Sequence, residues 1–313
     1  MKAYTLGVII PTYNRASMLK RTIESVLRQD YQNITHIVVT DDGSTDNTRE
    51  VVEEFQKRDS RIVYIQNTKY MKGPTGNKNN GLDYIEYEAK PDFFCILDDD
   101  DELLPNAIST LIKICEQNPD YDIVIGNCVN NDGNFTGRHY GKSEELDFVD
   151  FLCERYVGNY FGLVRTSLLK GKRFKEETWG GESILWLSLR KNARKTYYYH
   201  GVFKRYELRG ERVSKKMVSN AKRAFLNYKY VLDLFEEDYL NCCPNIYARR
   251  CLTAALFAKL SDDKENFRKY IKLAFERHKG FKTFLIAFTL FLPNPLLIFL
   301  RFKVWSIVKR FFY

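Results

Sequence analysis

A run of acidic residues, Asp98 to Glu102, directly follows the apolar run Phe93-Phe94-Cys95-Ile96-Leu97. A short apolar run bounded by Pro91 and by charged residues predicts a buried strand that ends at Leu97. Adjacent carboxylates repel one another, and burying them without partners costs free energy. We therefore expect these acids at an open sheet edge, where their oxygens suit Mg²⁺ or Mn²⁺. The alternative is a solvated acidic turn that begins the next helix.

Apolar runs alternate with segments of helical spacing over the first 125 or so residues. Strands are expected at 6–10, 34–39, 62–65, 93–97 and 121–126, with helices between them. This alternation with short connections predicts an α/β fold in which helices flank a mostly parallel sheet. Asp41-Asp42 follows the second run as Asp98 follows the fourth, so both acidic clusters should lie at one edge, where such sheets bind ligands.

Three motifs in this region resemble those of the family 2 glycosyltransferases. They are Val8-Ile9-Ile10-Pro11-Thr12-Tyr13-Asn14-Arg15, Val38-Val39-Thr40-Asp41-Asp42-Gly43-Ser44-Thr45-Asp46 and Leu97-Asp98-Asp99-Asp100-Asp101-Glu102-Leu103. The resemblance covers about the first 215 residues. It implies a Rossmann-like GT-A domain over 1–215 that transfers a sugar from a nucleotide-sugar donor with inversion.

The resemblance also assigns donor contacts. By analogy, the residues along the nucleotide are Pro11, Thr12, Tyr13 and Arg15. Asp41 matches the acid that accepts a hydrogen bond from the base, which suits the N3–H group of uracil. Lys78 stands where the family usually has Arg, and it still supplies charge to a diphosphate but loses the bidentate fork. The alternative for Lys78 is a solvated surface lysine.

Asp98-Asp99-Asp100 fills the family's Asp-x-Asp motif. The resemblance places Asp98 and Asp99 with the donor and makes Asp100 the ligand of Mn²⁺ or Mg²⁺. Such an ion neutralises the nucleoside diphosphate as it leaves.

An inverting transfer needs a base for the acceptor hydroxyl, and Glu182 is the candidate. Aligning Leu185-Trp186-Leu187 with the family's apolar helix places Glu182 on the usual Asp, whereas a slip of one residue would place Ser183 there. The alternative is that Glu182 is only a first-turn helix acid. The segment that contains Arg209 and Arg212 resembles the loop that closes over the diphosphate in this family. The resemblance makes these two arginines candidate phosphate contacts.

Helices are expected over 216–280, and the segment 281–313 differs in composition. Phe284 to Leu300 holds no charge, but Pro293-Asn294-Pro295 interrupts it, so each half is too short to span a bilayer. The bases that follow are Arg301, Lys303, Lys309 and Arg310. This pattern predicts an interfacial or re-entrant anchor drawn to anionic lipid, and hence a peripheral membrane contact; the alternative is a helix docked on the protein's own core.

The chain is thus interpreted as a metal-dependent hexosyl- or N-acetylhexosaminyltransferase that uses a UDP-sugar donor and a lipid-linked or polysaccharide acceptor. Met1 to Gly7 lacks the features of a signal peptide, which favours a cytoplasmic protein on the inner face of the cell membrane. Nucleic acid is not an expected partner, because the surplus of basic residues lies with apolar ones.

Two rival functions stay open. A catalytically inactive nucleotide-sugar-binding scaffold of the same fold would bind donor without turnover. A nucleotide-sugar nucleotidyltransferase would need a Gly-rich basic phosphate loop, which Pro11 to Arg15 does not provide.

Overall fold

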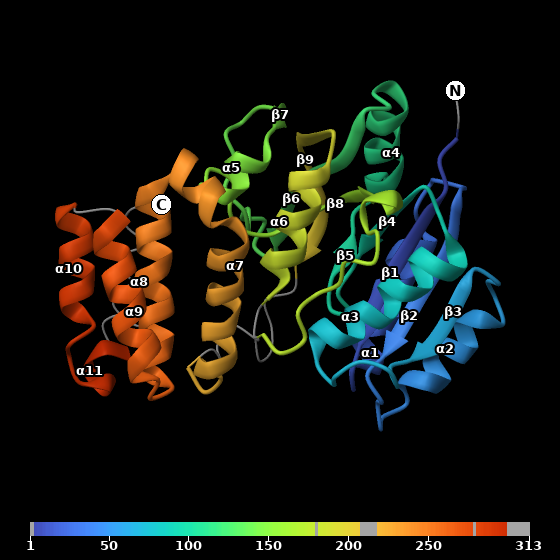
Figure 1. The fold of residues 1–313 in the computed structure, drawn as a ribbon. Coiled ribbons are helices and arrows are strands. Elements are labelled where there is room, and N and C mark those ends of the chain that lie inside the picture. Colours follow the sequence, from blue (N-terminus) through green and yellow to red (C-terminus); the bar gives the residue numbers. More distant parts are fainter. Residues whose placement is uncertain (1–2, 179–180, 207–217, 278–279, 299–313) are drawn as a thin grey trace. The chain divides into compact units, whose positions relative to one another are not determined.

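The computed structural model describes residues 3–178, 181–206, 218–277 and 280–298, which belong to two compact units (Figure 1). The first unit runs to Glu176 and resumes at Gly181. The second unit contains the helices from Ala221 onward. The predicted boundaries at 215 and 280 stay predictions.

The first unit is built on one nine-stranded sheet. Its strands are β1 (Leu6–Thr12), β2 (Ile34–Asp41), β3 (Ile62–Gln66), β4 (Phe93–Ile96), β5 (Glu102–Leu103), β6 (Tyr121–Asn130), β7 (Glu144–Leu146), β8 (Tyr160–Arg165) and β9 (Lys195–Tyr206). The order is β3-β2-β1-β4-β8-β6-β9-β5, with β7 paired to β9. β1, β2, β3, β4, β6 and β9 run in one direction, whereas β5, β7 and β8 run against them. The predicted α/β class with a mostly parallel sheet is confirmed.

Helices cover both faces of this sheet. They are α1 (Ala16–Leu27), α2 (Thr48–Gln56), α3 (Pro74–Asp83), α4 (Ala107–Gln117), α5 (Phe148–Leu152) and α6 (Glu182–Asn192), with two further turns, η1 (Tyr84–Ala89) and η2 (Thr166–Leu168). Apolar side chains at helical spacing on α1, α2 and α4 join the core that includes Val8 and Ile10 of β1. α3 packs on the opposite face, where a Cβ at Gly81 would lie 2.5 Å from Ile9 Cγ2. Only glycine lets α3 approach the strand this closely.

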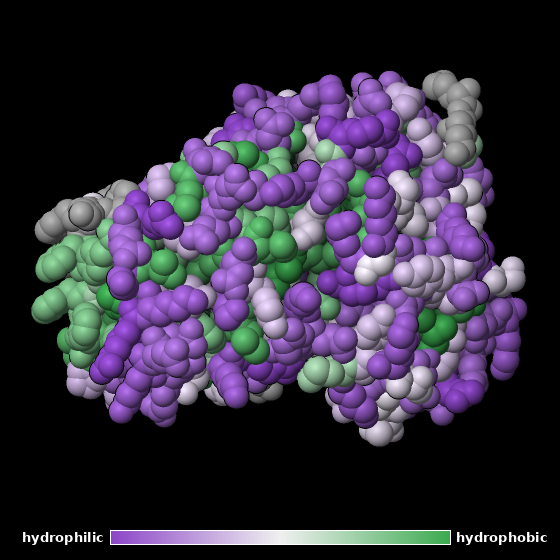
Figure 2. All heavy atoms as spheres, viewed as in Figure 1, coloured by the Kyte–Doolittle hydropathy of each residue, from purple (hydrophilic) through white to green (hydrophobic). Residues whose placement is uncertain are grey.

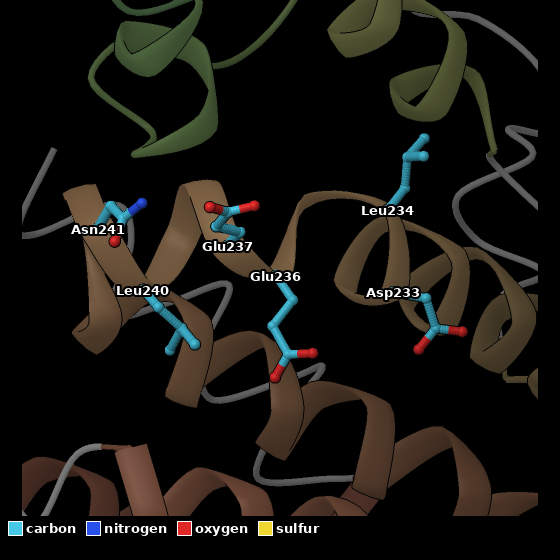
Figure 3. A pocket seen from close by; sticks show the side chains of 6 residues that line it. All are labelled: Asp233, Leu234, Glu236, Glu237, Leu240 and Asn241. Atoms are coloured by element: carbon cyan, nitrogen blue, oxygen red, sulfur yellow. The ribbon is translucent and has the colours of Figure 1, made fainter.

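The second unit is helical. It comprises α7 (Ala221–Cys242), α8 (Pro244–Leu260), α9 (Lys264–Arg277), α10 (Phe281–Thr289) and α11 (Asn294–Ile298). α7 is kinked at Phe235, whose φ of −122° and ψ of 21° are not helical. A surface hollow of about 450 Å³ lies beside the kink, and Figure 3 shows Leu234 and Glu236 pointing in opposite directions there. Within the described residues, no helix is both long and apolar enough to cross a bilayer.

Candidate functional site

The two acidic clusters meet at one edge of the sheet. β1 lies between β2 and β4 and is parallel to both, with Thr12 of β1 paired with Asp41 of β2. The backbone N–H of Leu97 donates to the carbonyl of Ile9 at 2.9 Å, so the acidic loop begins beside the last residues of β1. The prediction that Asp41 and Asp98 share the carboxyl edge is confirmed.

Arg15 neutralises the middle of the acidic loop. Its Nη1 lies 2.9 Å from Asp99 Oδ1 and 2.8 Å from Asp100 Oδ2. The Thr12 hydroxyl donates to Asp99 Oδ2 at 2.7 Å. Burial raises the pKa of Asp99 to about 6, even though the charge of Arg15 lowers it. Burial raises the pKa of Asp100 in the same way. These carboxylates are therefore poised to gain from any further positive charge.

Lys78 connects the acidic loop to the candidate base. Its Nζ lies 2.9 Å from Asp98 Oδ1 and 2.6 Å from Glu182 Oε1, and its side chain is only 7% exposed. Burial lowers the pKa of Lys78, but the charges of Asp98 and Glu182 outweigh that effect and leave it above its ordinary value. The alternative of a solvated surface lysine is wrong. Glu182, the first residue of α6, lies at this edge although it is 104 positions from Lys78 in the sequence.

Two contacts that support the acidic loop were not predicted from the sequence. Lys204 of β9 is buried and forms an ion pair with Asp101, which is fully buried. The Thr22 hydroxyl of α1 lies 2.9 Å from the carbonyl oxygen of Asp99 and 2.8 Å from that of Asp101. A lysine inside an apolar strand was a usable signal, because such a charge needs a buried partner. No pattern in the neighbouring sequence indicated that Thr22 supports the loop.

Asp41 is held by a residue of the turn after β2 and by a residue of β3. The Ser44 hydroxyl donates to Asp41 Oδ1 at 2.5 Å, and the Tyr64 hydroxyl donates to Oδ2 at 2.7 Å. Burial and the bond to Asp41 raise the pKa of Tyr64, so this phenol stays a donor. A ligand N–H group that donates to Asp41 would add a third hydrogen bond to this carboxylate. The side chain is thus fixed in place at the edge.

The Gly-rich loop before α3 is tied to the same edge. The N–H of Gly73 donates to Asp42 Oδ2 at 2.6 Å. The Asn77 amide donates to the carbonyls of Thr12 at 3.0 Å and Thr40 at 2.8 Å, which joins α3 to the ends of β1 and β2. These bonds place Lys78 beside the acidic loop.

The remaining predicted residues occupy different positions. Pro11 is buried within β1, whereas the Tyr13 side chain is 52% exposed. The Tyr13 ring is therefore accessible to a ligand at the edge. Arg209 and Arg212 lie outside the described residues, as do Trp179 and Gly180.

Asp98 and Asp100 are acids of the loop that are partly open to solvent and could bind a divalent ion. Among the described residues, no group of three or more histidine, cysteine or acidic side chains is arranged to hold an ion. The Asp98 and Asp100 carboxylates are 41% and 20% exposed and face Lys78 and Arg15. Hard oxygen donors that are partly open to solvent fit Mg²⁺ or Mn²⁺, provided that Arg15 gives way at Asp100.

Comparisons with known proteins agree on one family. Residues 7–175 match the family model described as glycosyl transferase family 2. The GalNAc(5)-diNAcBac-PP-undecaprenol beta-1,3-glucosyltransferase of Campylobacter jejuni is 38% identical over 87% of both chains. The UDP-Glc:alpha-D-GlcNAc-diphosphoundecaprenol beta-1,3-glucosyltransferase WfgD of Escherichia coli is 36% identical over 41% of this chain and 50% of that protein.

A solved structure shows the same fold. S. aureus TarS in complex with UDP-GlcNAc superposes with a TM-score of 0.59 over 85% of this chain and 90% of TarS. The sequence identity is 17%, so this likeness concerns the fold alone. The predicted GT-A architecture is confirmed.

Proposed function

The chain belongs to glycosyl transferase family 2, and from this premise we propose that it transfers a hexose or N-acetylhexosamine from a UDP-sugar, with inversion, to a glycan carried on a polyprenyl diphosphate. The contact of Lys78 with both Asp98 and Glu182 carries the proposal, because it brings a carboxylate from α6 to the donor edge. The names of the C. jejuni and E. coli relatives support an acceptor linked to a polyprenyl diphosphate. The E. coli name and the Asp41 position support a UDP-sugar.

Glu182 acts as the base in this proposal. Lys78 holds Oε1, and in the described part of the chain Oε2 takes part in no hydrogen bond or ion pair. Oε2 takes the proton of the acceptor hydroxyl while the hydroxyl oxygen attacks the anomeric carbon. The bond from that carbon to the diphosphate breaks, and its electron pair leaves with the UDP. Transfer thus needs acceptor and donor on opposite sides of the reacting carbon.

The charged side chains at this edge bind the diphosphate of the donor. Mn²⁺ or Mg²⁺ held by Asp100 would neutralise the negative charge that develops on the departing UDP. Arg15 and Lys78 are positive side chains at the same edge, and either can shift from an acid to a phosphate oxygen.

A donor-binding experiment tests this function. We expect thermal-shift stabilisation by one UDP-sugar with Mn²⁺, in a panel of UDP-, GDP- and CMP-sugars, together with slow release of UDP. Asp100→Ala should abolish both effects, whereas the control Asp132→Ala, at an exposed loop position, should leave them unchanged. Binding without release of UDP, even with polyprenyl-diphosphate-linked acceptors, would favour the inactive scaffold. Absence of binding by every nucleotide would contradict the proposal.

A second experiment tests the base. Glu182→Gln keeps the shape of the side chain but cannot take a proton, so we expect transfer to be lost while UDP-sugar binding persists. Ser183→Ala is the matched control, because it removes the residue that a one-position slip would make the base. Full turnover by Glu182→Gln would exclude Glu182 from the mechanism.

The helical unit supports a peripheral contact with anionic membrane. Phe284, Phe288 and Phe291, here called the phenylalanine face, are 59%, 63% and 67% exposed, whereas Ala287 and Leu290 are buried. α10 packs against α8 and α9, so part of the tail docks on the protein itself and part stays open. Figure 2 shows apolar side chains gathered over α10. An exposed aromatic face followed by a basic segment is typical of interfacial anchors.

A further inference from the structure

Three rings gather beside β6 and β9 and form what we call the ring platform: Phe135, His139 and His200. The ring centroids of Phe135 and His139 are 4.1 Å apart, those of His139 and His200 are 5.3 Å apart, and those of Phe135 and His200 are 6.0 Å apart. The interplanar angles of the pairs lie between 31° and 46°. Phe135 and His139 are exposed and His200 is partly exposed, so part of this ring surface is open to solvent.

The platform lies on the same face of the sheet as the candidate base. Val124 and Cys128 of β6 belong to the core under α1, α2 and α4. Side chains alternate along a strand, so Asn127, which contacts His200, faces the other way, toward the side that carries α3. α6, which begins at Glu182, is joined to α3 through the Lys78 contact.

The platform also lies near the reacting edge. β6 runs in the direction of β4, so the loop that follows Asn130 and carries Phe135 and His139 leaves from the carboxyl edge. On β9, His200 precedes Lys204, which contacts Asp101 of the acidic loop. Four residues of regular strand would span about 13 Å, and β9 is irregular here, so the separation is at most this distance, which a short sugar chain can cover.

The hydrogen bonds around His200 determine which of its nitrogens faces a ligand. The Asn127 amide group donates to the carbonyl of Gly201 at 3.2 Å, which leaves Asn127 Oδ1 to accept the proton of the Tyr198 hydroxyl at 2.8 Å. His200 Nδ1 lies 3.1 Å from the Tyr198 oxygen and 3.5 Å from Asn127 Nδ2. Nδ1 therefore has a polar partner in either neutral tautomer, donating to Tyr198 or accepting from Asn127. Among the described residues, Nε2 has no partner.

Backbone bonds hold the loop that carries the platform. The N–H of Thr136 donates to the carbonyl of Cys128 at 3.0 Å, and the N–H of Arg138 donates to that of Val157 at 2.8 Å. The Tyr160 hydroxyl donates to the carbonyl of Arg138 at 2.5 Å. A surface that is ordered before binding loses less entropy when a ligand arrives.

We propose that the ring platform binds a pyranose ring of the acceptor glycan, one or more sugars away from the hydroxyl that reacts. The inference rests on the proposed function, since it takes the acceptor to be a glycan. The electron-rich ring faces receive the C–H groups of the sugar, and His200 Nε2 forms a hydrogen bond with a sugar hydroxyl. The platform thus recognises a sugar that is already part of the acceptor.

Saturation-transfer NMR with methyl glycosides and disaccharides of Glc, Gal, GlcNAc and GalNAc tests the platform on the full chain. We expect saturable binding of at least one sugar, weakened about tenfold by Phe135→Ala and by His139→Ala, since each removes a ring face. His200→Phe keeps a ring but removes the hydrogen-bonding group Nε2, so it should weaken binding as well. Tyr199→Ala is the matched control, because Tyr199 is exposed on β9 but packs against Phe203.

UDP binding, measured by thermal shift on the same samples, separates this inference from the proposed function. We expect all four variants to bind UDP as the unmodified chain does. Two outcomes would overturn the platform while leaving the donor site intact. One is the absence of sugar binding, and the other is equal sugar binding by the unmodified chain and by the Phe135→Ala and His139→Ala variants. Loss of every nucleotide-dependent shift together with retained, ring-dependent sugar binding would overturn the donor proposal and not the platform.

Discussion

Lys78 is the residue on which the geometry of the site depends most. Its buried amine separates the Asp98 and Glu182 carboxylates and contacts both. Removing one partner of such an arrangement leaves acids without a counter-charge. We therefore expect Lys78→Met to lower the free energy of unfolding by roughly 2 kcal/mol, below the cost for fully buried pairs because both acids are partly open to water. It should also abolish UDP release.

Urea unfolding and the UDP-release assay measure the two effects separately. Lys57→Met, at an exposed position after α2, is the control and should change neither. Lys78→Arg keeps the charge and introduces the residue usual in the family, so we expect it to retain most of the stability. A Lys78→Met protein as stable and active as the unmodified chain would show that the amine contributes nothing at this edge.

At the level of strands, Asp122 joins three elements. It begins β6 and accepts hydrogen bonds from Arg165 of β8 at 2.7 Å and from Arg194, just before β9, at 2.7 Å. Asp122→Asn removes the charge from this junction, and we expect a loss of roughly 2 kcal/mol in the free energy of unfolding near pH 7. Asp120→Asn is the control, because Asp120 also contacts Arg194 but its side chain is 71% exposed.

The pH dependence of stability provides a second test of Asp122. Burial raises its pKa, but the hydrogen bonds from Arg194 and Arg165 lower it more, so the folded value lies below 3.8. The unfolded chain then binds more protons, and the stabilisation is present above about pH 5 and is lost as the pH falls through the folded pKa. Urea unfolding at several pH values should show the difference between the unmodified chain and Asp122→Asn shrinking below about pH 4. A constant difference would contradict the assignment.

The parallel half of the sheet could be predicted because its signals are local. β1, β2 and β4 are short apolar runs followed by polar residues, and the helices between them carry apolar residues at helical spacing. The position of β8 between β4 and β6 depends on pairing between distant segments, which no local pattern reports. The site follows the same division: the acids of the loop were visible in the sequence, whereas the contact of Lys204 with Asp101 needed the fold.

On the scale of the whole chain, apolar surface is exposed at the opposite end of the sequence from the donor motifs. Lys259 donates to the carbonyls of Leu290 at 2.7 Å and Leu292 at 2.6 Å, so the end of α10 is fixed against α8. This fixed helix keeps the phenylalanine face turned outward. An acceptor anchored by a polyprenyl chain would be encountered at a membrane surface. In the proposed reaction, the phenylalanine face would bind the protein to that surface.

Replacing Phe284, Phe288 and Phe291 together by Ser tests this contact. Partial burial of each phenyl ring in lipid contributes about 1 kcal/mol, so the triple variant should bind vesicles containing phosphatidylglycerol about 100-fold more weakly. Cosedimentation measures the partition, and Leu234→Ser, at a position 55% exposed on α7, is the control for loss of an apolar side chain. The binding that remains should rest on the basic residues and should fall as salt is added, since screening weakens attraction to anionic lipid. Unchanged partition of the triple variant would leave the basic segment alone as the anchor and would contradict a role for α10.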